Sequence, residues 1–174
     1  MNFLNKYSKN VVKYDFINKF NYNLSKAIPK LKSIVLTFNI KNSNIQTLYS
    51  ALSAIEFIVY QKPTLIVSKT SNISIKLRKG QPVGCKVTLR KSKLKHFLFI
   101  LLNKFKLKRL KAKGKNKVFF SCRISNILIF NKLEKNYKFF KHLSDLNVNI
   151  STTNCSNDEV LFLLKSNKLI KRQM

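Results

Sequence analysis

The stretch QKPTLIVSKTSNISIKLRKGQPVGCKVTLR, residues 61–90, decides the fold of this chain. Apolar residues alternate there with basic or hydroxyl residues in two arms, 73–77 and 83–89, and this period of two is typical of strands with one buried and one exposed face. The link KGQP favours a chain reversal, because Gly80 can adopt positive φ and Pro82 has a fixed φ. The stretch therefore predicts two paired strands whose exposed face has Lys76, Arg78, Lys86, Thr88 and Arg90.

The residues before this stretch predict a helix, a strand and a second helix. Residues 1–20 favour a peripheral helix, since apolar residues recur there near helical spacing with lysines between them. Residues 31–40 have the β-branched and aromatic density of a strand, with Ile34, Leu36 and Phe38 on one face. A capping pattern at Ser43 opens a helix whose face of Ile45, Leu48, Leu52, Ile55 and Val59 packs across a sheet.

The residues after it alternate between the two kinds of element. Ser92 can cap a helix with Leu94, Phe97, Leu98, Leu101 and Phe105 on its apolar face. Residues 104–117 are too basic to bury themselves, and they predict a mobile basic loop that contacts phosphate. We then expect a strand over 118–124, its continuation or partner over 127–130, a weak helix over 133–143, a strand at Val148 and Ile150, and a helix opened by a capping box at Ser156 and Glu159.

The charge of the chain limits its partners. Its 174 residues contain 35 Lys and Arg against 6 Asp and Glu, which gives a formal charge of +29. Such a charge on one compact domain repels itself, and we expect a polyanionic partner, either nucleic acid or an anionic membrane. No apolar run approaches the roughly 20 residues that span a bilayer.

Composition also indicates a compartment. Lys, Asn, Ile, Phe and Leu are abundant while Gly, Pro, Ala and Trp are scarce, a bias that an A+T-rich organelle genome would impose. The N-terminal segment has neither a secretory core nor the arginines of most transit peptides, so we expect no cleaved leader. The three cysteines are far apart and without CxxC spacing, which favours a reducing compartment and predicts neither disulfides nor a metal site.

Catalytic chemistry is not indicated. The chain has no HExxH, GxSxG, GxGxxG or P-loop pattern, and Asp158 and Glu159 are explained by dipole complementation at a helix start. His96 lies off the apolar stripe of its helix and is expected at the surface. The sequence predicts a protein that is not an enzyme and has no cofactor.

Two segments resemble a known family. The run QKP, the following loop with its serine and lysines, and KLRKGQPVGCKVTLR closely resemble the bacterial-type universal large-subunit ribosomal protein five, whose pattern is GQKP, a KS-containing loop and FKLREGxPIGxKVTLRG. The segment FNYNLSKAIPKLKSIVLTFNI, residues 20–40, is similar to the family's YxNxxxxPKIxKIVLNMGVG. The resemblance covers residues 14–105 well and the C-terminal third in outline.

The resemblance implies a fold and a function. The fold is of the α+β class, a single domain with an antiparallel β-sheet and α-helices packed mainly on one face. The function is that of a structural constituent of the large ribosomal subunit, in the central protuberance, where it binds 5S rRNA and large-subunit rRNA, contacts peptidyl-site tRNA and adjoins other ribosomal proteins. With the compositional bias, this implies a mitochondrial protein of the matrix, in the large subunit of the mitochondrial ribosome.

Residue by residue, the resemblance implies two sets of RNA contacts. The loop 68–79 would face tRNA, with Lys69, Ser71, Lys76, Arg78 and Lys79 as contacts. The residues that would contact rRNA are Tyr22, Asn23, Lys30, Thr37, Gln61, Lys62, Thr88, Arg90 and Lys91. Lysine and arginine neutralise phosphate, while glutamine and threonine can bond sugar or base edges.

The chain departs from the family pattern at several positions. Thr37 replaces an asparagine, and Asn39, Lys41 and Lys91 replace glycines. Because glycine allows close approach and positive φ, these replacements make the backbone path at the RNA face the open question.

Two other functions remain open. A free-standing RNA chaperone or splicing-type RNA-binding protein could use the same basic sheet, but such proteins usually stack bases on aromatic residues of the open sheet face. Here that face is predicted to have Lys, Arg, Thr and Ser, which favours recognition of folded RNA. A peripheral protein of an anionic membrane is the third alternative, because the N-terminal segment is basic and amphipathic.

Overall fold

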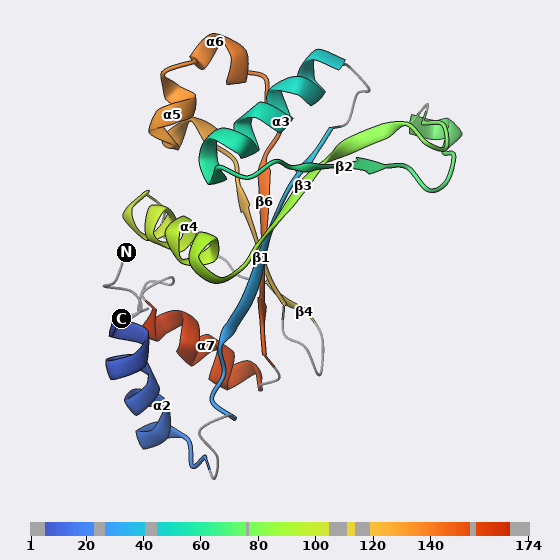
Figure 1. Ribbon diagram of the computed structural model, residues 1–174. Coiled ribbons are helices and arrows are strands. Elements are labelled where there is room, and N and C mark those ends of the chain that lie inside the picture. The colour runs from blue at the N-terminus through green and yellow to red at the C-terminus, as the bar shows by residue number, and fades with distance from the viewer. Residues whose placement is uncertain are drawn as a thin grey trace. The chain divides into compact units, whose positions relative to one another are not determined.

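The structure, a computed structural model, describes residues 6–22, 27–40, 45–75, 77–104, 111–113, 119–153 and 156–167. A six-stranded sheet runs through it in the order β2-β3-β1-β6-β5-β4 (Figure 1). The strands are β1 (Leu31–Asn39), β2 (Thr64–Val67), β3 (Pro82–Leu89), β4 (Lys111–Lys113), β5 (Phe119–Ile124) and β6 (Leu146–Thr152). The pairs β2/β3 and β4/β5 are antiparallel. The expected α+β class with an antiparallel sheet is confirmed.

Helices precede, separate and follow the strands along the chain. They are the π-helical η1 (Ser8–Val12), α2 (Lys13–Lys19), α3 (Ile45–Val59), the 3₁₀ turns η2 (Ile73–Ile75) and η3 (Ile127–Ile129), α4 (Lys91–Lys104), α5 (Asn131–Glu134), α6 (Tyr137–Phe140) and α7 (Asn157–Ser166). Contacts divide the chain into two compact units. Unit 1 comprises Met1–Ile34, Arg90–Cys122 and Asn149–Met174, and unit 2 comprises Val35–Leu89 and Arg123–Val148.

The core of unit 2 forms where β1 and β3 lie against each other. Leu36 and Phe38 of β1 and Cys85 and Leu89 of β3 are fully buried, as the period of two predicts. Gly84 brings the two backbones together, because a Cβ there would overlap the carbonyl oxygen of Phe38. The backbone N–H of Ile40 continues the contact by donating to the carbonyl of Val83 at 2.8 Å. A residue without a side chain is therefore required at position 84.

The helix α3 packs in unit 2 through a face that is displaced from the one the sequence predicts. Its buried residues are Ala51, Ala54, Ile55, Ile58 and Val59, whereas the predicted face member Ile45 is 67% exposed. Small alanines let the middle of the helix approach its neighbours closely, so the buried stripe is displaced from the larger side chains. The capping residue predicted at position 43 lies outside the described residues.

Tyr60 ends α3 in a left-handed conformation, with φ of 56°. Its N–H donates to the carbonyl of Glu56 at 2.7 Å. The family pattern GQKP has glycine at this position, where positive φ costs nothing. In this chain, the ammonium group of Lys132 lies 3.5 Å from the centroid of the Tyr60 ring, a cation–π contact that partly offsets the backbone strain.

Two predicted strands are wrong. Within the predicted strand 73–77, Ile73–Ile75 form η2 and Leu77 makes a single bridge with Asn72. It is β2 that pairs with β3, with Thr64 opposite Lys86. The side chain of Asn72 accepts from the N–H of Ser74 at 3.1 Å and so favours a local turn over a ladder. Residues 127–129 form η3 for the same reason, because the side chain of Asn126 accepts from the N–H of Leu128 at 3.1 Å.

The basic segment 104–117 differs from the predicted loop where it is described. Lys104 ends α4, and Lys111–Lys113 form β4, paired with Phe119–Ser121 of β5. Strand pairing satisfies the backbone groups of the segment, which explains why residues too basic for a core can still form a strand. Residues 105–110 and 114–118 lie outside the described residues.

The core of unit 1 includes the N-terminal helix. Val12 and Phe16 are buried together with Ile28 and Leu163 of α7. The ring of Phe16 meets that of Phe162 edge-on, with centroids 4.9 Å apart. The predicted capping box at the start of α7 is confirmed, since the Ser156 N–H donates to Glu159 Oε2 at 2.7 Å and the Glu159 N–H donates to Ser156 Oγ at 3.3 Å. The N-terminal helix is therefore integral to its unit.

Replacing Gly84 by alanine should lower the free energy of unfolding by about 1–3 kcal/mol, because the added methyl group forces β3 away from Phe38. Urea denaturation measures this change. Lys86→Ala is the control, since Lys86 is exposed on the same strand and its loss should change stability by no more than about 0.5 kcal/mol. Equal stability of Gly84→Ala and Lys86→Ala would contradict the close approach.

Candidate nucleic-acid interface

The loop that follows β2 is closed at its base by backbone hydrogen bonds. The N–H of Ser68 donates to the carbonyl of Gln81, and the N–H of Gly80 donates to the carbonyl of Ser68, each at 2.9 Å. This base continues the pairing of β2 with β3, in which Val67 lies opposite Pro82. The loop is therefore anchored to the sheet at both ends.

A tight turn presents Arg78 and Lys79. The N–H of Gln81 donates to the carbonyl of Arg78 at 3.2 Å, and Gly80 adopts φ of 87° within the turn. The Gln81 side chain adds a second contact, since its Oε1 accepts from the N–H of Arg78 at 2.9 Å. Because the turn is bonded from both sides, the exposed Arg78 and Lys79 side chains project from a braced backbone.

The tip of the loop is a smaller closed turn. Backbone groups of Asn72 and Leu77 exchange two hydrogen bonds, at 2.9 and 3.0 Å. This leaves Ile73 94% exposed at the end of the loop. Lys69 and Ser71 are exposed beside the tip, and Lys76 lies outside the described residues. An exposed isoleucine among cations suits contact with a base or ribose face next to phosphates.

The charge around this loop is of one sign in the sequence. No acidic residue occurs between Glu56 and Glu134, a stretch that includes β2, the loop, β3 and α4. A local positive field of this kind attracts polyanions and is screened by salt.

The face of β1 and β3 opposite the core of unit 2 is polar except for Val35. The buried residues of β1 and β3 alternate with residues on the opposite face, which are Val35, Thr37, Asn39, Lys86 and Thr88. None of these five is aromatic, so this face has no platform for base stacking. Thr37 and Thr88, both predicted rRNA contacts, are half-buried on adjacent strands, where their hydroxyls can bond ribose.

The other predicted rRNA contacts are divided between the units. In unit 2, Gln61 is half-buried and Lys62 exposed just after α3. In unit 1, Lys30, Arg90 and Lys91 are exposed. Tyr22 is half-buried there, and its hydroxyl donates to Glu159 Oε1 at 2.6 Å. This hydroxyl is therefore engaged in a hydrogen bond within the fold. Asn23 lies outside the described residues.

Lys91 holds a strained backbone at the start of α4. Its φ is 49°, in the left-handed region, where the family pattern has glycine after TLR. A side chain in this region costs roughly 1–2 kcal/mol. The backbone at position 91 therefore has a conformation that glycine adopts without strain, and the Lys91 side chain is exposed there.

An aromatic groove in unit 2 was missed by the sequence analysis. It has a volume of about 650 Å³ and is lined by Tyr49 and Phe57 of α3, by Phe139 of α6 and by Lys138 and His142, among others. Tyr49 and Phe139 are 65% and 77% exposed. The alternation of apolar and polar residues gave no sign of it, because the groove depends on how α3 and α6 meet.

The two described cysteines, Cys85 and Cys122, do not form a reactive site, and Cys155 lies outside the described residues. Burial raises the pKa of the Cys85 thiol to about 11, against a smaller lowering by the Phe38 backbone, and burial raises the pKa of Cys122 to about 12. Both are protonated at neutral pH and act as core residues, as predicted for Cys122. Within the described part of the chain, no three His, Cys, Asp or Glu side chains converge as metal ligands. Every helix described is too short or too polar to cross a bilayer.

Comparison with known proteins gives full-length relatives. The chain is 36% identical to large ribosomal subunit protein uL5 of Geotalea uraniireducens over 168 residues, which cover 91% of this chain and 92% of that protein. It is 33% identical to uL5 of Geotalea daltonii, over 91% and 92% of the two chains. It is 31% identical to the protein named uL5m of Reclinomonas americana, over 94% of each chain. No family model matches the chain.

The strain at Lys91 can be measured with two substitutions that both remove its charge. The free energy of unfolding of Lys91→Gly should exceed that of Lys91→Ala by up to about 1 kcal/mol, because only glycine adopts the left-handed φ without strain. The greater entropy of glycine in the unfolded chain reduces this difference. Thermal or urea unfolding gives the difference. Equal stability of the two variants would mean that position 91 is unstrained.

Proposed function

Because this chain belongs to the family of large ribosomal subunit protein uL5, we propose that it is a structural component of the large ribosomal subunit that acts by binding RNA. In detail, it lies in the central protuberance, holds 5S rRNA against the large-subunit rRNA, and extends the loop 68–79 to tRNA in the peptidyl site. Neighbouring ribosomal proteins complete its surroundings. The relatives are ribosomal proteins. In this proposal the chain acts by holding RNA molecules in position.

The braced loop is the observation that supports the tRNA contact. Its base is closed by the Ser68 and Gln81 pairing, and its turn presents exposed Arg78 and Lys79 from a backbone bonded on both sides. A rigid cationic loop loses little conformational entropy when it meets a phosphate backbone, so more of the electrostatic attraction becomes affinity. Lys69, Ser71 and Lys76 extend the proposed contact along the loop.

The proposed rRNA contacts combine hydroxyl, amide and cationic groups. In unit 2, Thr37, Thr88 and Gln61 supply groups that can bond ribose hydroxyls and base edges, with Lys62 as a cation beside Gln61. In unit 1, Lys30, Arg90 and Lys91 supply further cations, and Tyr22 and Asn23 complete the proposed set. The polar, non-aromatic face of β1 and β3 supports recognition of folded RNA over the stacking of single strands expected from an RNA chaperone.

We place the protein in the mitochondrial matrix, as part of the mitochondrial ribosome. The bias toward Lys, Asn, Ile and Phe is that of an A+T-rich organelle genome. The relative from Reclinomonas americana, which bears the organellar form of the name, uL5m, supports this location.

Sedimentation of a native organelle extract tests the function. At about 0.3 M salt, where exposed charge pairs are largely screened, the chain should migrate with the large subunit. Ultraviolet crosslinking of the same fractions should join the loop to tRNA. A chain that stays at the top of the gradient, bound to assorted RNA, would instead indicate the RNA chaperone.

Charge reversal in the loop should separate tRNA contact from assembly. Arg78→Glu with Lys79→Glu should reduce crosslinking to peptidyl-site tRNA by at least about tenfold, because two charge-assisted contacts to phosphate are lost, while sedimentation with the large subunit is unchanged. Lys135→Glu with Lys141→Glu is the matched control, since both lysines are exposed in unit 2 outside the loop. Loss of assembly in the loop variant alone would contradict the assigned role.

A further inference from the structure

The aromatic groove of unit 2 has exposed rings from two different helices. Tyr49 and Phe57 come from α3, where Tyr49, Ser53 and Phe57 follow each other at intervals of four and so share one side of the helix. Phe139 comes from α6, which contacts α3 (Figure 1). The exposed fractions are 65% for Tyr49, 44% for Phe57 and 77% for Phe139. Three large rings are thus open to solvent at one site.

A buried ring supports one of the exposed rings. Phe140 is 4% exposed, and its ring meets that of Phe57 edge-on, with centroids 6.1 Å apart and an interplanar angle of 83°. Edge-to-face contact is a favoured arrangement of two aromatic rings, because the positive edge of one meets the negative face of the other. The Phe57 ring is therefore held in place before a ligand arrives, which lowers the entropy cost of binding.

The charge at the aromatic groove is positive. Lys138 lines it, and no Asp or Glu is among the described residues of its lining. Lys135 and Lys141 are exposed three positions before and after Lys138. The acids of the neighbouring helices, Glu56 of α3 and Glu134 of α5, are exposed and lie outside the lining. Three lysines on one short segment favour a ligand that has negative charge.

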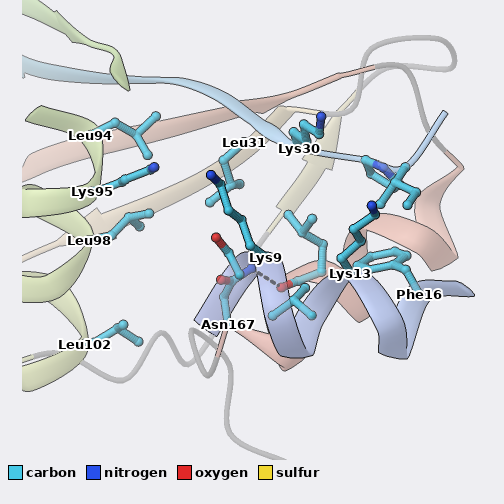
Figure 2. Close-up of a pocket in the computed structure, with 15 residues that line it drawn as sticks. Lys9, Lys13, Phe16, Lys30, Leu31, Leu94, Lys95, Leu98, Leu102 and Asn167 are labelled. Carbon is cyan, nitrogen blue, oxygen red and sulfur yellow. Dashed lines mark hydrogen bonds between the residues drawn. The ribbon is translucent and has the colours of Figure 1, made fainter. Parts of the chain in front are cut away.

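A groove of similar volume in unit 1, about 650 Å³, lacks this combination (Figure 2). Among the described residues of its lining, Phe16 is the single aromatic one, and it is 0% exposed. Leu94 and Leu98 are 4% and 7% exposed. The lysines that line it are Lys9, Lys13, Lys30 and Lys95. That groove offers no exposed ring to a ligand, whereas the aromatic groove does.

The chemistry of the aromatic groove matches an unpaired nucleotide. Every base has a π face that stacks on an aromatic ring, and its phosphate needs a cation nearby. The amides of Gln46 and Asn136 and the hydroxyl of Ser53 can bond base edges and the ribose 2′-OH. The volume of about 650 Å³ lies within the range of about 300–1,000 Å³ of small-ligand sites, so it suits one or two nucleotides.

The same lining is less suited to an apolar segment of another protein. Amide and hydroxyl side chains occur between the rings, and they are those of Gln46, Thr47, Ser50, Ser53 and Asn136. An apolar side chain placed over such groups removes water from them and returns no hydrogen bond, which costs free energy. A nucleotide offers both a ring for the aromatic residues and polar edges for these groups.

We propose that the aromatic groove binds an unpaired nucleotide of RNA, whose base stacks on Tyr49 or Phe139 and whose phosphate meets Lys138. The inference rests on the proposed function for the source of that nucleotide, a base extruded from folded ribosomal RNA. None of the described lining residues belongs to the loop 68–79 or to a strand, so this contact is separate from those already proposed. It adds base stacking, for which the face of β1 and β3 has no platform.

Two RNA strands isolate the stacking on the full chain. Both are six nucleotides long and labelled for fluorescence anisotropy at about 0.3 M salt; one is all adenosine and the other has every base removed. Their phosphates are the same, so the electrostatic attraction is equal. The unaltered protein should bind the adenosine strand at least about fivefold more tightly, since stacking of a base is worth about five- to a hundredfold in affinity.

Ring removal assigns the preference to the aromatic groove. Tyr49→Ala with Phe139→Ala should bring the two affinities within about twofold of each other, whereas Tyr49→Phe with Phe139→Tyr should keep the preference, because both rings remain. Lys138→Ala should weaken both strands alike, because it removes a phosphate contact and no ring. Circular dichroism of each variant shows whether the fold is retained.

The matched control removes one tyrosine and one phenylalanine elsewhere. Tyr14→Ala with Phe99→Ala alters rings of unit 1 that are 60% and 50% exposed, and should leave the preference unchanged. Equal loss in both alanine double variants would overturn the proposal. Equal binding of the two strands by the unaltered protein would overturn it as well, and this comparison needs no substitution.

Crosslinking in assembled large subunits identifies the natural nucleotide. A photoreactive amino acid at position 139 should crosslink to a ribosomal RNA base, as read by mass spectrometry. Crosslinks to a protein alone would overturn this inference and leave the ribosomal function intact. A chain that is absent from the large subunit would contradict the proposed function, while the two RNA strands decide separately whether the groove stacks bases.

Discussion

The close approach of Gly84 to the carbonyl of Phe38 is the constraint on which unit 2 depends. This close approach lets β3 pair with β1 in the sheet. The side chains of Cys85, Val87 and Leu89 then enter the core on one face, and those of Lys86 and Thr88 lie on the other. The outer edge of β3 is then free to pair with β2, and the two strands run on to the loop base at Ser68 and Gln81. A basic loop is thus held by a packing contact in the sheet.

Two residues other than glycine adopt the left-handed backbone conformation that glycine adopts without strain. Tyr60 and Lys91 stand where the family pattern has glycine, and both keep positive φ, at 56° and 49°. Each position bears a cost of roughly 1–2 kcal/mol that glycine would avoid. At Tyr60 the cation–π contact between the ring and the ammonium group of Lys132 offsets part of that strain. The chain therefore leaves α3 and enters α4 through left-handed residues despite their side chains.

The formal charge of +29 requires that cations lie where water and anions can reach them. In unit 2 they include the cations of the loop, Lys86 on the open sheet face and the exposed lysines of residues 132–141, and in unit 1 four lysines line an apolar groove. Lysine tolerates the second arrangement, because its long aliphatic stem covers apolar surface while its ammonium group stays hydrated. Repulsion between these groups weakens the isolated fold and makes anionic partners stabilising.

The sequence by itself determined the α+β class, the strands β1, β3, β5 and β6, the capping box of α7 and the family, because period-two burial, cap chemistry and a contiguous motif are local properties of the chain. It also located the loop and its cations. Only the tertiary structure decided that β2, in place of residues 73–77, pairs with β3, that Tyr22 bonds Glu159, and that two grooves form. At Asn72 and Asn126, local turns held by the asparagine side chains form in place of strand pairing. Grooves arise only where residues distant in sequence meet.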